Sequence, residues 1–303
     1  MTSDNTRIAD PSPQAFAGDS PGQTAKRLFG AMRPKFFPAS VLPVLAGTAW
    51  GFSASGSFDW LVFALALFAT VCVHGASNVL NDVGDDSGGT DRQNDDRIYP
   101  YTGGSRFIQQ GIMSPAEMAR WGTSLLAMAA IAGIVLIYLK GAMVLYFGLA
   151  GVLLAVLYSL GPVRLASMGI GETAVAIGFG VVPVAGAAWL QGASLGASLL
   201  IYSLPVSLWV TAILLINEVP DIAADGATGK RTLPVRLGLG GTSVVYLLLH
   251  LGAAAATVWL AIAGAMPLLA PAVPVLLLAI ALRATLAIRK GLEDRDGMTK
   301  AIE

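Results

Sequence analysis

Long apolar stretches alternate with shorter polar segments along most of this chain. A helix that crosses a membrane needs roughly 20 predominantly apolar residues. Eight such stretches can be drawn, at residues 36–52, 60–81, 116–139, 142–160, 171–190, 198–217, 242–263 and 267–288. Pro38 and Pro43 interrupt the first, but proline is tolerated where neighbouring helices satisfy the freed backbone groups. The pattern predicts an all-α fold, a polytopic transmembrane helical bundle of about eight spans.

Composition supports the membrane assignment. The chain has 303 residues, of which 55% are hydrophobic and 13% charged, and its mean hydropathy is +0.67. A soluble domain of average usage is less apolar and more charged. The 19 basic and 19 acidic residues balance, and no nucleic-acid partner is expected. We therefore predict that the chain is embedded in a lipid bilayer.

The basic residues predict the orientation of the spans. If the N-terminus is cytoplasmic, an alternating eight-span chain puts eighteen of the nineteen Lys and Arg residues inside and only Lys140 outside. Cytoplasmic loops of membrane proteins carry such an excess. We expect a multi-pass protein of the cell inner (cytoplasmic) membrane with both termini cytoplasmic. Residues 1–25 read as a disordered cytoplasmic tail, 26–290 as the transmembrane domain, and 291–303 as a charged cytoplasmic C-terminal tail.

A polar pattern, Asn-x₃-Asp-x₃-Asp, occurs twice, each time where an apolar stretch ends on the predicted cytoplasmic side. The two frames are Asn78, Asp82 and Asp86, and Asn217, Asp221 and Asp225. Residues four apart share one face of a helix, so each frame predicts an amide and two carboxylates on one side of a helix end. Carboxylates gathered in this way repel unless a cation lies between them, and Mg²⁺ takes a few carboxylates together with substrate phosphates.

The loops after the two frames mix acidic, basic and glycine residues. The further polar candidates are Asp85, Asp91, Arg92, Arg106, Lys230 and Arg231, with Gly103 and Gly104 between them. Carboxylates suit a metal, cations suit phosphate oxygens, and glycine allows the backbone to approach a ligand closely. The alternative is that these charges face water or only set the orientation of the spans. Glu218, beside Asn217, is expected to be solvated.

Residues 78–91 followed by 103–106, and residues 217–238, resemble the two signature loops of the UbiA superfamily of intramembrane aromatic prenyltransferases. Residues 157–165 and 169–172 resemble the linker after that family's fourth helix. The spacing of Asp82, Asp85 and Asp91, with the run Gly-Lys-Arg-Thr-Leu-Pro-Val-Arg-Leu-Gly at 229–238, is most similar to the menaquinone branch. That branch prenylates 1,4-dihydroxy-2-naphthoate. The chain departs from the family in Pro220, which suggests a kink before Asp221. It also departs in its number of spans, since the family usually has nine helices and about eight are expected here.

The resemblance implies a bundle around a central cavity that opens to the cytoplasm and binds polyprenyl diphosphate, Mg²⁺ and an aromatic acceptor. We assign Asp82, Asp85, Asp86, Asp221 and Asp225 to the metal, and all of these except Asp85 also to catalysis. Asn78 and Asn217 are assigned as amide ligands or orienters, and Arg92, Arg106, Lys230 and Arg231 as candidates for the diphosphate. Tyr158, the candidate catalytic aromatic residue, and Ser159 are assigned to orienting the acceptor or shielding a cation, although an interfacial tyrosine explains Tyr158 equally well.

Other functions fit the pattern less well. A monocyclic acceptor such as 4-hydroxybenzoate stays open within the same superfamily. An ion or metabolite transporter also gathers carboxylates, but it is expected to bring them to the middle of the membrane on broken helices. A scaffold protein would not require two matched frames. The acids here cluster toward one membrane face, which favours the enzyme.

Overall fold

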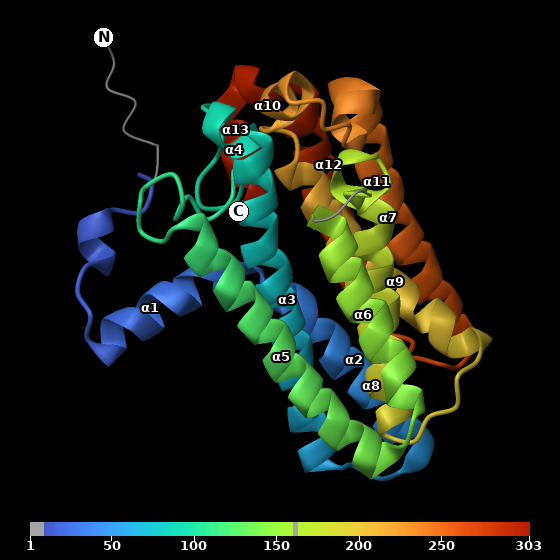
Figure 1. Ribbon diagram of the computed structural model, residues 1–303. Helices are drawn as coiled ribbons and strands as arrows, with labels where there is room; N and C mark the ends of the chain where they lie inside the picture. The colour runs from blue at the N-terminus through green and yellow to red at the C-terminus, as the bar shows by residue number, and fades with distance from the viewer. Residues whose placement is uncertain (1–8, 160–162) are drawn as a thin grey trace.

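The protein is described by a computed structural model that covers residues 9–159 and 163–303, and over these residues its secondary structure is helical (Figure 1). Seven helices in this part of the chain are long and apolar enough to cross a membrane. They confirm the predicted all-α bundle. The predicted fourth span corresponds to a shorter apolar helix of 17 residues, and its expected last residue, Leu160, lies outside the described residues.

The long helices follow the predicted apolar stretches. They are α2 (Pro38–Ser55), α3 (Trp60–Gly88), α5 (Pro115–Lys140), α6 (Met143–Ser159), α9 (Ala197–Asn217), α11 (Leu233–Ile262) and α12 (Ala272–Lys290), while the fifth stretch forms α7 (Gly171–Val175), a π-helical segment (Ala176–Val181) and α8 (Val182–Leu190). The short helices α4 (Thr90–Gln93), α10 (Ile222–Ala227) and α13 (Arg295–Ile302) cluster at one end of the bundle in Figure 1. That end carries both acidic motifs.

Two glycines bring α2 and α8 into backbone contact. A Cβ built on Gly47 would lie 2.1 Å from the carbonyl oxygen of Val184, and one built on Gly51 would lie 2.5 Å from that of Ala188. Glycines four residues apart on one helix face allow such close packing in membranes. The first span is thereby fixed against the fifth.

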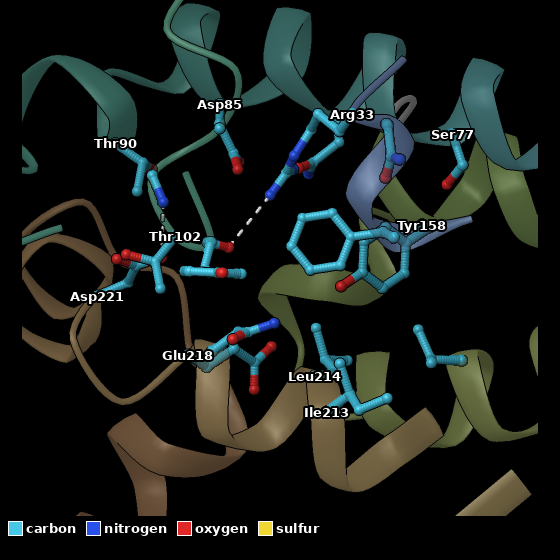
Figure 2. Close-up of a pocket in the computed structure, with 18 of the residues that line it drawn as sticks. Arg33, Ser77, Asp85, Thr90, Thr102, Tyr158, Ile213, Leu214, Glu218 and Asp221 are labelled. Carbon is cyan, nitrogen blue, oxygen red and sulfur yellow. Dashed lines mark hydrogen bonds between the residues drawn. The ribbon is translucent and has the colours of Figure 1, made fainter. Parts of the chain in front are cut away.

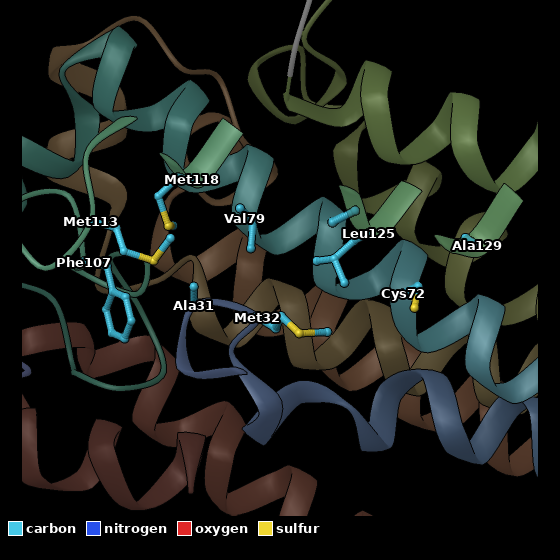
Figure 3. Packing of buried hydrophobic residues seen from close by; sticks show 10 residues of the cluster. Ala31, Met32, Cys72, Val79, Phe107, Met113, Met118, Leu125 and Ala129 are labelled. Carbon is cyan, nitrogen blue, oxygen red and sulfur yellow. The ribbon is translucent and has the colours of Figure 1, made fainter. Parts of the chain in front are cut away.

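One hydrophobic cluster connects the start of the chain to α3 and α5 (Figure 3). Its buried members are Ala31, Met32, Cys72, Ala76, Val79, Phe107, Met113, Met118, Leu125 and Ala129. Cys72 is a buried free thiol within it, as a structural cysteine would be. Because Phe107 and Met113 belong to the loop after the first motif, the cluster also anchors that loop on α3.

Described residues near both ends of the chain, in 9–31 and 291–303, form helical turns and helices. Within the expected disordered tail, Pro13–Phe16 form a 3₁₀ turn and α1 (Pro21–Ala31) begins after Ser20, whose hydroxyl caps the amide of Gln23. Phe16 packs edge-on against Phe107 at 4.8 Å. The charged C-terminal segment folds as α13 and buries Met298 completely. Averaged polarity hides these single anchoring residues, so the expectation of disorder is wrong for residues 13–16 and 21–25.

Candidate active site

The two acidic motifs have equal spacing but different backbone geometry. The first lies on one continuous helix, since α3 extends past Asp86 to Gly88 and is followed by Gly89, which has φ +82°. In the second, α9 ends at Asn217, a turn carries Pro220 and Asp221, and Asp225 lies on α10. The prediction that the second frame occupies one helix face is therefore wrong, because Pro220 cannot continue the helix.

A pocket of about 1020 Å³, part of it open to solvent, lies between the two motifs (Figure 2). In Figure 2, Asp85 and Arg33 project from one wall and Glu218 and Asp221 from the opposite wall. Of the predicted site residues, the pocket is lined by Asn78, Asp85, Asp91, Tyr158, Asn217, Asp221, Asp225 and Lys230. The structure thus brings residues of both motifs around one space.

The part of this space away from the charged residues is mostly apolar. Val175, Phe179, Val210, Ile213 and Leu214 line it, with the polar side chains of His74 and Ser77 among them. An adjoining cavity of about 420 Å³ shares Tyr158 and Phe179 and continues between α3, α6 and the π-helical segment. The pocket therefore joins a charged mouth to an apolar interior.

Lys230 connects the two motifs across the pocket. Its ammonium lies 3.2 Å from Asp85 Oδ2 and 3.5 Å from Asp225 Oδ1. Burial opposes the charge on Lys230, but Asp85 and Asp225 outweigh it and raise its pKa well above the ordinary value. Burial also raises the pKa of Asp225 to about 7, against the opposing effect of Lys230. In the structure, Lys230 is the counter-ion of both carboxylates.

Asp82 and Asp91 approach each other beside Gly104. The amide of Ser105 donates to Asp82 Oδ2 at 3.0 Å. A Cβ on Gly104, whose φ is +75°, would lie 2.8 Å from Asp91 Oδ2 and 3.0 Å from Asp82 Oδ1. Burial and the nearby Asp82 raise the pKa of Asp91 to about 9. Only glycine allows the chain to pass this close to two carboxylates.

Asp221 is held by the loop that follows the first motif. Asn94 Nδ2 donates to its Oδ1 at 2.7 Å, and the amide of Gly103 donates to its Oδ2 at 3.3 Å. Burial raises the pKa of Asp221, against the hydrogen bond from Asn94. The carboxylate of one motif is thus oriented by the loop of the other.

Four predicted site residues point elsewhere. Asp86 accepts hydrogen bonds from Arg92, at 3.0 and 3.1 Å, and from Gln109 at 3.2 Å. Arg106 is buried and donates to the backbone carbonyl of Asp91, whereas Arg231 is exposed. None of these four predicted residues lines the pocket. Asp82 does not line it directly either, but its Oδ1 would lie 3.0 Å from a Cβ on Gly104, which does line the pocket. The first motif therefore turns Asp85, rather than Asp86, toward the pocket.

The remaining predicted polar residues are partly engaged. Asn78 donates to the carbonyl of Met32 at 2.9 Å while still lining the pocket. Ser159 accepts a hydrogen bond from Asn81 at 3.1 Å and lines a neighbouring cavity with Tyr158 and Lys230. These contacts fasten α3 to the chain before α2 and to α6.

Sequence reasoning missed two charged residues that line the pocket. Arg33, before the first span, has φ +56° and places its guanidinium 3.8 Å from Asp82 Oδ1. Glu218 is 9% exposed rather than solvated, because the turn at Pro220 folds it inward. Burial and the neighbouring Glu172 raise the pKa of Glu218 well above its usual value. The available signal for Glu218 was its place inside the second motif, directly after Asn217 and two residues before Pro220, whereas Arg33 belongs to no motif.

The donor set suits a metal that arrives with its substrate. Among the residues the structure describes, no group of three or more His, Cys, Asp or Glu side chains is close enough to hold an ion. Several buried oxygens nevertheless accept no hydrogen bond there, namely Asp82 Oδ1, Asp91 Oδ2, Asn217 Oδ1 and Asp225 Oδ1. Mg²⁺ is usually held by one or two carboxylates together with substrate phosphates and water. The residues present fit that form of binding.

Comparison with known families identifies the class. The model of the UbiA prenyltransferase family matches residues 40–299. The chain therefore belongs to this family and is a prenyltransferase, which confirms the predicted resemblance and the predicted enzyme class.

Two bacterial relatives are named 1,4-dihydroxy-2-naphthoate octaprenyltransferase. The protein from Haemophilus influenzae is 32% identical over 221 residues, covering 68% of this chain and 67% of the relative. The Escherichia coli protein is 32% identical over 216 residues, covering 69% and 67%. The chain thus spans about two thirds of the length of these relatives.

Solved structures of the family share the fold. A UbiA homologue from Archaeoglobus fulgidus bound to GPP and Mg²⁺ has a TM-score of 0.65 and 17% identity, with 86% of each chain covered. The apo structure of a homologue from Aeropyrum pernix has a TM-score of 0.64 and 19% identity, with 92% of each chain covered. At these identities the likeness establishes the helical fold.

Proposed function

We propose that the protein transfers a polyprenyl group from polyprenyl diphosphate to 1,4-dihydroxy-2-naphthoate in a reaction that requires Mg²⁺. The observation that carries this proposal is the pocket itself, in which Asp85 faces Asp225 across Lys230 above an apolar interior. The names of the bacterial relatives support the acceptor. The Archaeoglobus homologue, bound to GPP and Mg²⁺, supports the donor and the metal.

The charged mouth of the pocket is proposed to bind the diphosphate. Asp82, Asp85 and Asp91 on one side and Asp221 and Asp225 on the other would hold Mg²⁺, with the amide oxygen of Asn217 beside them. When bound, the metal stabilises the negative charge of the departing diphosphate. Lys230 and Arg33 supply further positive charge to the phosphate oxygens. Asp86, Arg92, Arg106 and Arg231 have no direct role in this proposal.

The apolar interior is proposed to hold the prenyl chain and the reacting carbons. The bond between the allylic carbon and the diphosphate oxygen breaks, and the electron pair leaves with the diphosphate. The ring carbon that bears the carboxylate forms the new carbon–carbon bond, and the carboxylate departs as CO₂, so atoms and charge balance. Phe179, Ile213 and Leu214 exclude water that would quench the allylic cation, and the ring of Tyr158 lies beside them.

The protein is further proposed to face the cytoplasm with this pocket and with both termini. The distribution of eighteen of nineteen basic residues supports that orientation. Site-directed labelling of single cysteines, introduced at Lys140 and Lys290 in a Cys72→Ser background, checks it. In intact cells an impermeant reagent should label only position 140.

The reaction is tested with purified protein, Mg²⁺ and labelled polyprenyl diphosphate, offered 1,4-dihydroxy-2-naphthoate or 4-hydroxybenzoate. Mass spectrometry should find a prenylated product that has lost CO₂ with the naphthoate. Prenylation of only 4-hydroxybenzoate would reassign the acceptor. Transport of the substrate across proteoliposomes, with no prenylated product, would contradict the proposed reaction and favour a transporter.

A further inference from the structure

Residues 9–31, called here the N-terminal segment, precede the part of the chain that the family model matches. This segment contacts the loop between α4 and α5. The carboxylate of Asp10 accepts two hydrogen bonds from Arg97, from Nε at 3.2 Å and from Nη2 at 2.6 Å. Gln110 donates to it at 2.9 Å, and Arg106 Nε lies 3.8 Å away. Because the side chains of Asp10 and Arg97 are only 18% and 19% exposed, this bidentate ion pair is largely protected from water.

Arg97 links Asp10 to the active site through hydrogen bonds. Its Nη1 donates to the carbonyl oxygen of Asn94 at 2.6 Å, and the side chain of Asn94 donates to Asp221 Oδ1 at 2.7 Å. Asn94 is 2% exposed. Three successive contacts therefore connect the N-terminal segment with a carboxylate of the pocket.

The same arginine also supports the second hydrogen bond to Asp221. A Cβ on Gly103 would lie 2.8 Å from Arg97 Cβ and 2.9 Å from its Cδ, so the stem of Arg97 lies directly against Gly103. The amide of Gly103 donates to Asp221 Oδ2. On the other side, Arg106 joins Asp10 to the backbone of Asp91. Asp10 thus contacts two arginines, one packed against Gly103 beside Asp221 and one hydrogen-bonded to the backbone of Asp91.

We propose that Asp10 is a positioning residue, which fixes Arg97 and through it the loop 94–105 that orients Asp221. The inference deepens the proposed function, on which its consequence for metal use rests. Asp10 itself does not line the pocket. Loss of its charge should leave the segment attached, because Phe16 still packs on Phe107 and Trp121 Nε1 still donates to the carbonyl of Leu28 at 2.9 Å. The effect should therefore fall on the loop rather than on the fold.

Hydrogen exchange of the full-length protein without substrate tests the positioning directly. In Asp10→Asn, peptides covering residues 94–105 should exchange about tenfold faster than in the wild type, the size expected for losing a charge-assisted hydrogen bond. Peptides from α9 and α12 should not change. Asp19→Asn is the matched control, since Asp19 lies on the same segment, is fully exposed and only approaches Arg27 at 4.0 Å. Equal exchange in the two variants would overturn the proposal.

The dependence of the rate on Mg²⁺ separates positioning from a general loss of structure. Asp10→Asn should raise the Mg²⁺ concentration for half-maximal rate several-fold, while the KM for the aromatic acceptor stays unchanged. Asp10→Glu, which retains the charge, should lower that Mg²⁺ concentration part of the way back to the wild-type value. A parallel loss in both parameters, with no rescue by Asp10→Glu, would refute the positioning role. If the wild type shows no Mg²⁺-dependent transfer, the proposed function fails, and the exchange experiment still decides whether Asp10 orders the loop.

Discussion

Replacing Lys230 by Met should expose how strongly the two motifs depend on the cation between them. The ammonium lies 3.2 Å from Asp85 and 3.5 Å from Asp225, and its side chain is 15% exposed. Removing one partner of a buried ion pair costs about 3–5 kcal/mol. Because some exposure remains here, we expect about 3 kcal/mol of lost stability near pH 8, measured by denaturant unfolding in detergent.

The same substitution should make stability depend on pH. Burial already raises the pKa of Asp225 to about 7 while Lys230 opposes the shift, so without Lys230 the pKa of this carboxyl rises further. A carboxyl whose pKa is higher in the folded than in the unfolded protein binds more protons when folded, and stability then falls as pH rises. The deficit of Lys230→Met should therefore be smaller at pH 6 than at pH 8.

Two control variants and the activity complete this test. Lys230→Arg retains the charge and should keep most of the stability, and Lys290→Met removes an exposed partner of Asp294 and should change stability little. Transfer by Lys230→Met should fall by at least about 100-fold, since a charge that assists the leaving group is lost. A stable variant with no pH-dependent deficit would refute the reasoning.

Three further predictions concern the carboxylates. Asp221→Asn should reduce kcat about 100-fold or more. The kcat of Asp86→Asn should stay within about tenfold of the wild-type value, because Asp86 lies outside the pocket. Similar kcat values for the two variants would contradict the assignment. EDTA should abolish transfer and Mg²⁺ or Mn²⁺ restore it, with the melting temperature unchanged because Lys230 already bridges the motifs; full turnover in chelator would exclude the metal. Gly104→Ala should cost about 1–3 kcal/mol from its positive φ and separate Asp82 from Asp91, and calorimetry that shows no destabilisation would disprove the close approach.

The helices were predictable because their signal is local. Apolar runs located the long helices of the described residues, although α11 begins at Leu233, before the predicted run from residue 242, and Pro220 correctly marked a break before Asp221. The choice between Asp85 and Asp86 was not predictable, since adjacent residues on α3 differ only in the direction that packing assigns them. Arg33 and Asn94 lie far along the chain from the carboxylates they approach, and only the tertiary fold brings them there. The order of the N-terminal segment was not predicted, because its average polar composition conceals the two residues, Asp10 and Phe16, that anchor it to the loop after the first motif.

The bridging position of Lys230 has a consequence for the catalytic cycle. Under the proposed function, the substrate would bind at a site where two of the carboxylates, Asp85 and Asp225, already have Lys230 as their counter-ion, so binding there would exchange one cation for another. Such an exchange weakens the hold on the incoming complex. It would also ease release of the diphosphate, because Lys230 could again become the counter-ion of Asp85 and Asp225. The resting state thus favours turnover over tight retention of the product.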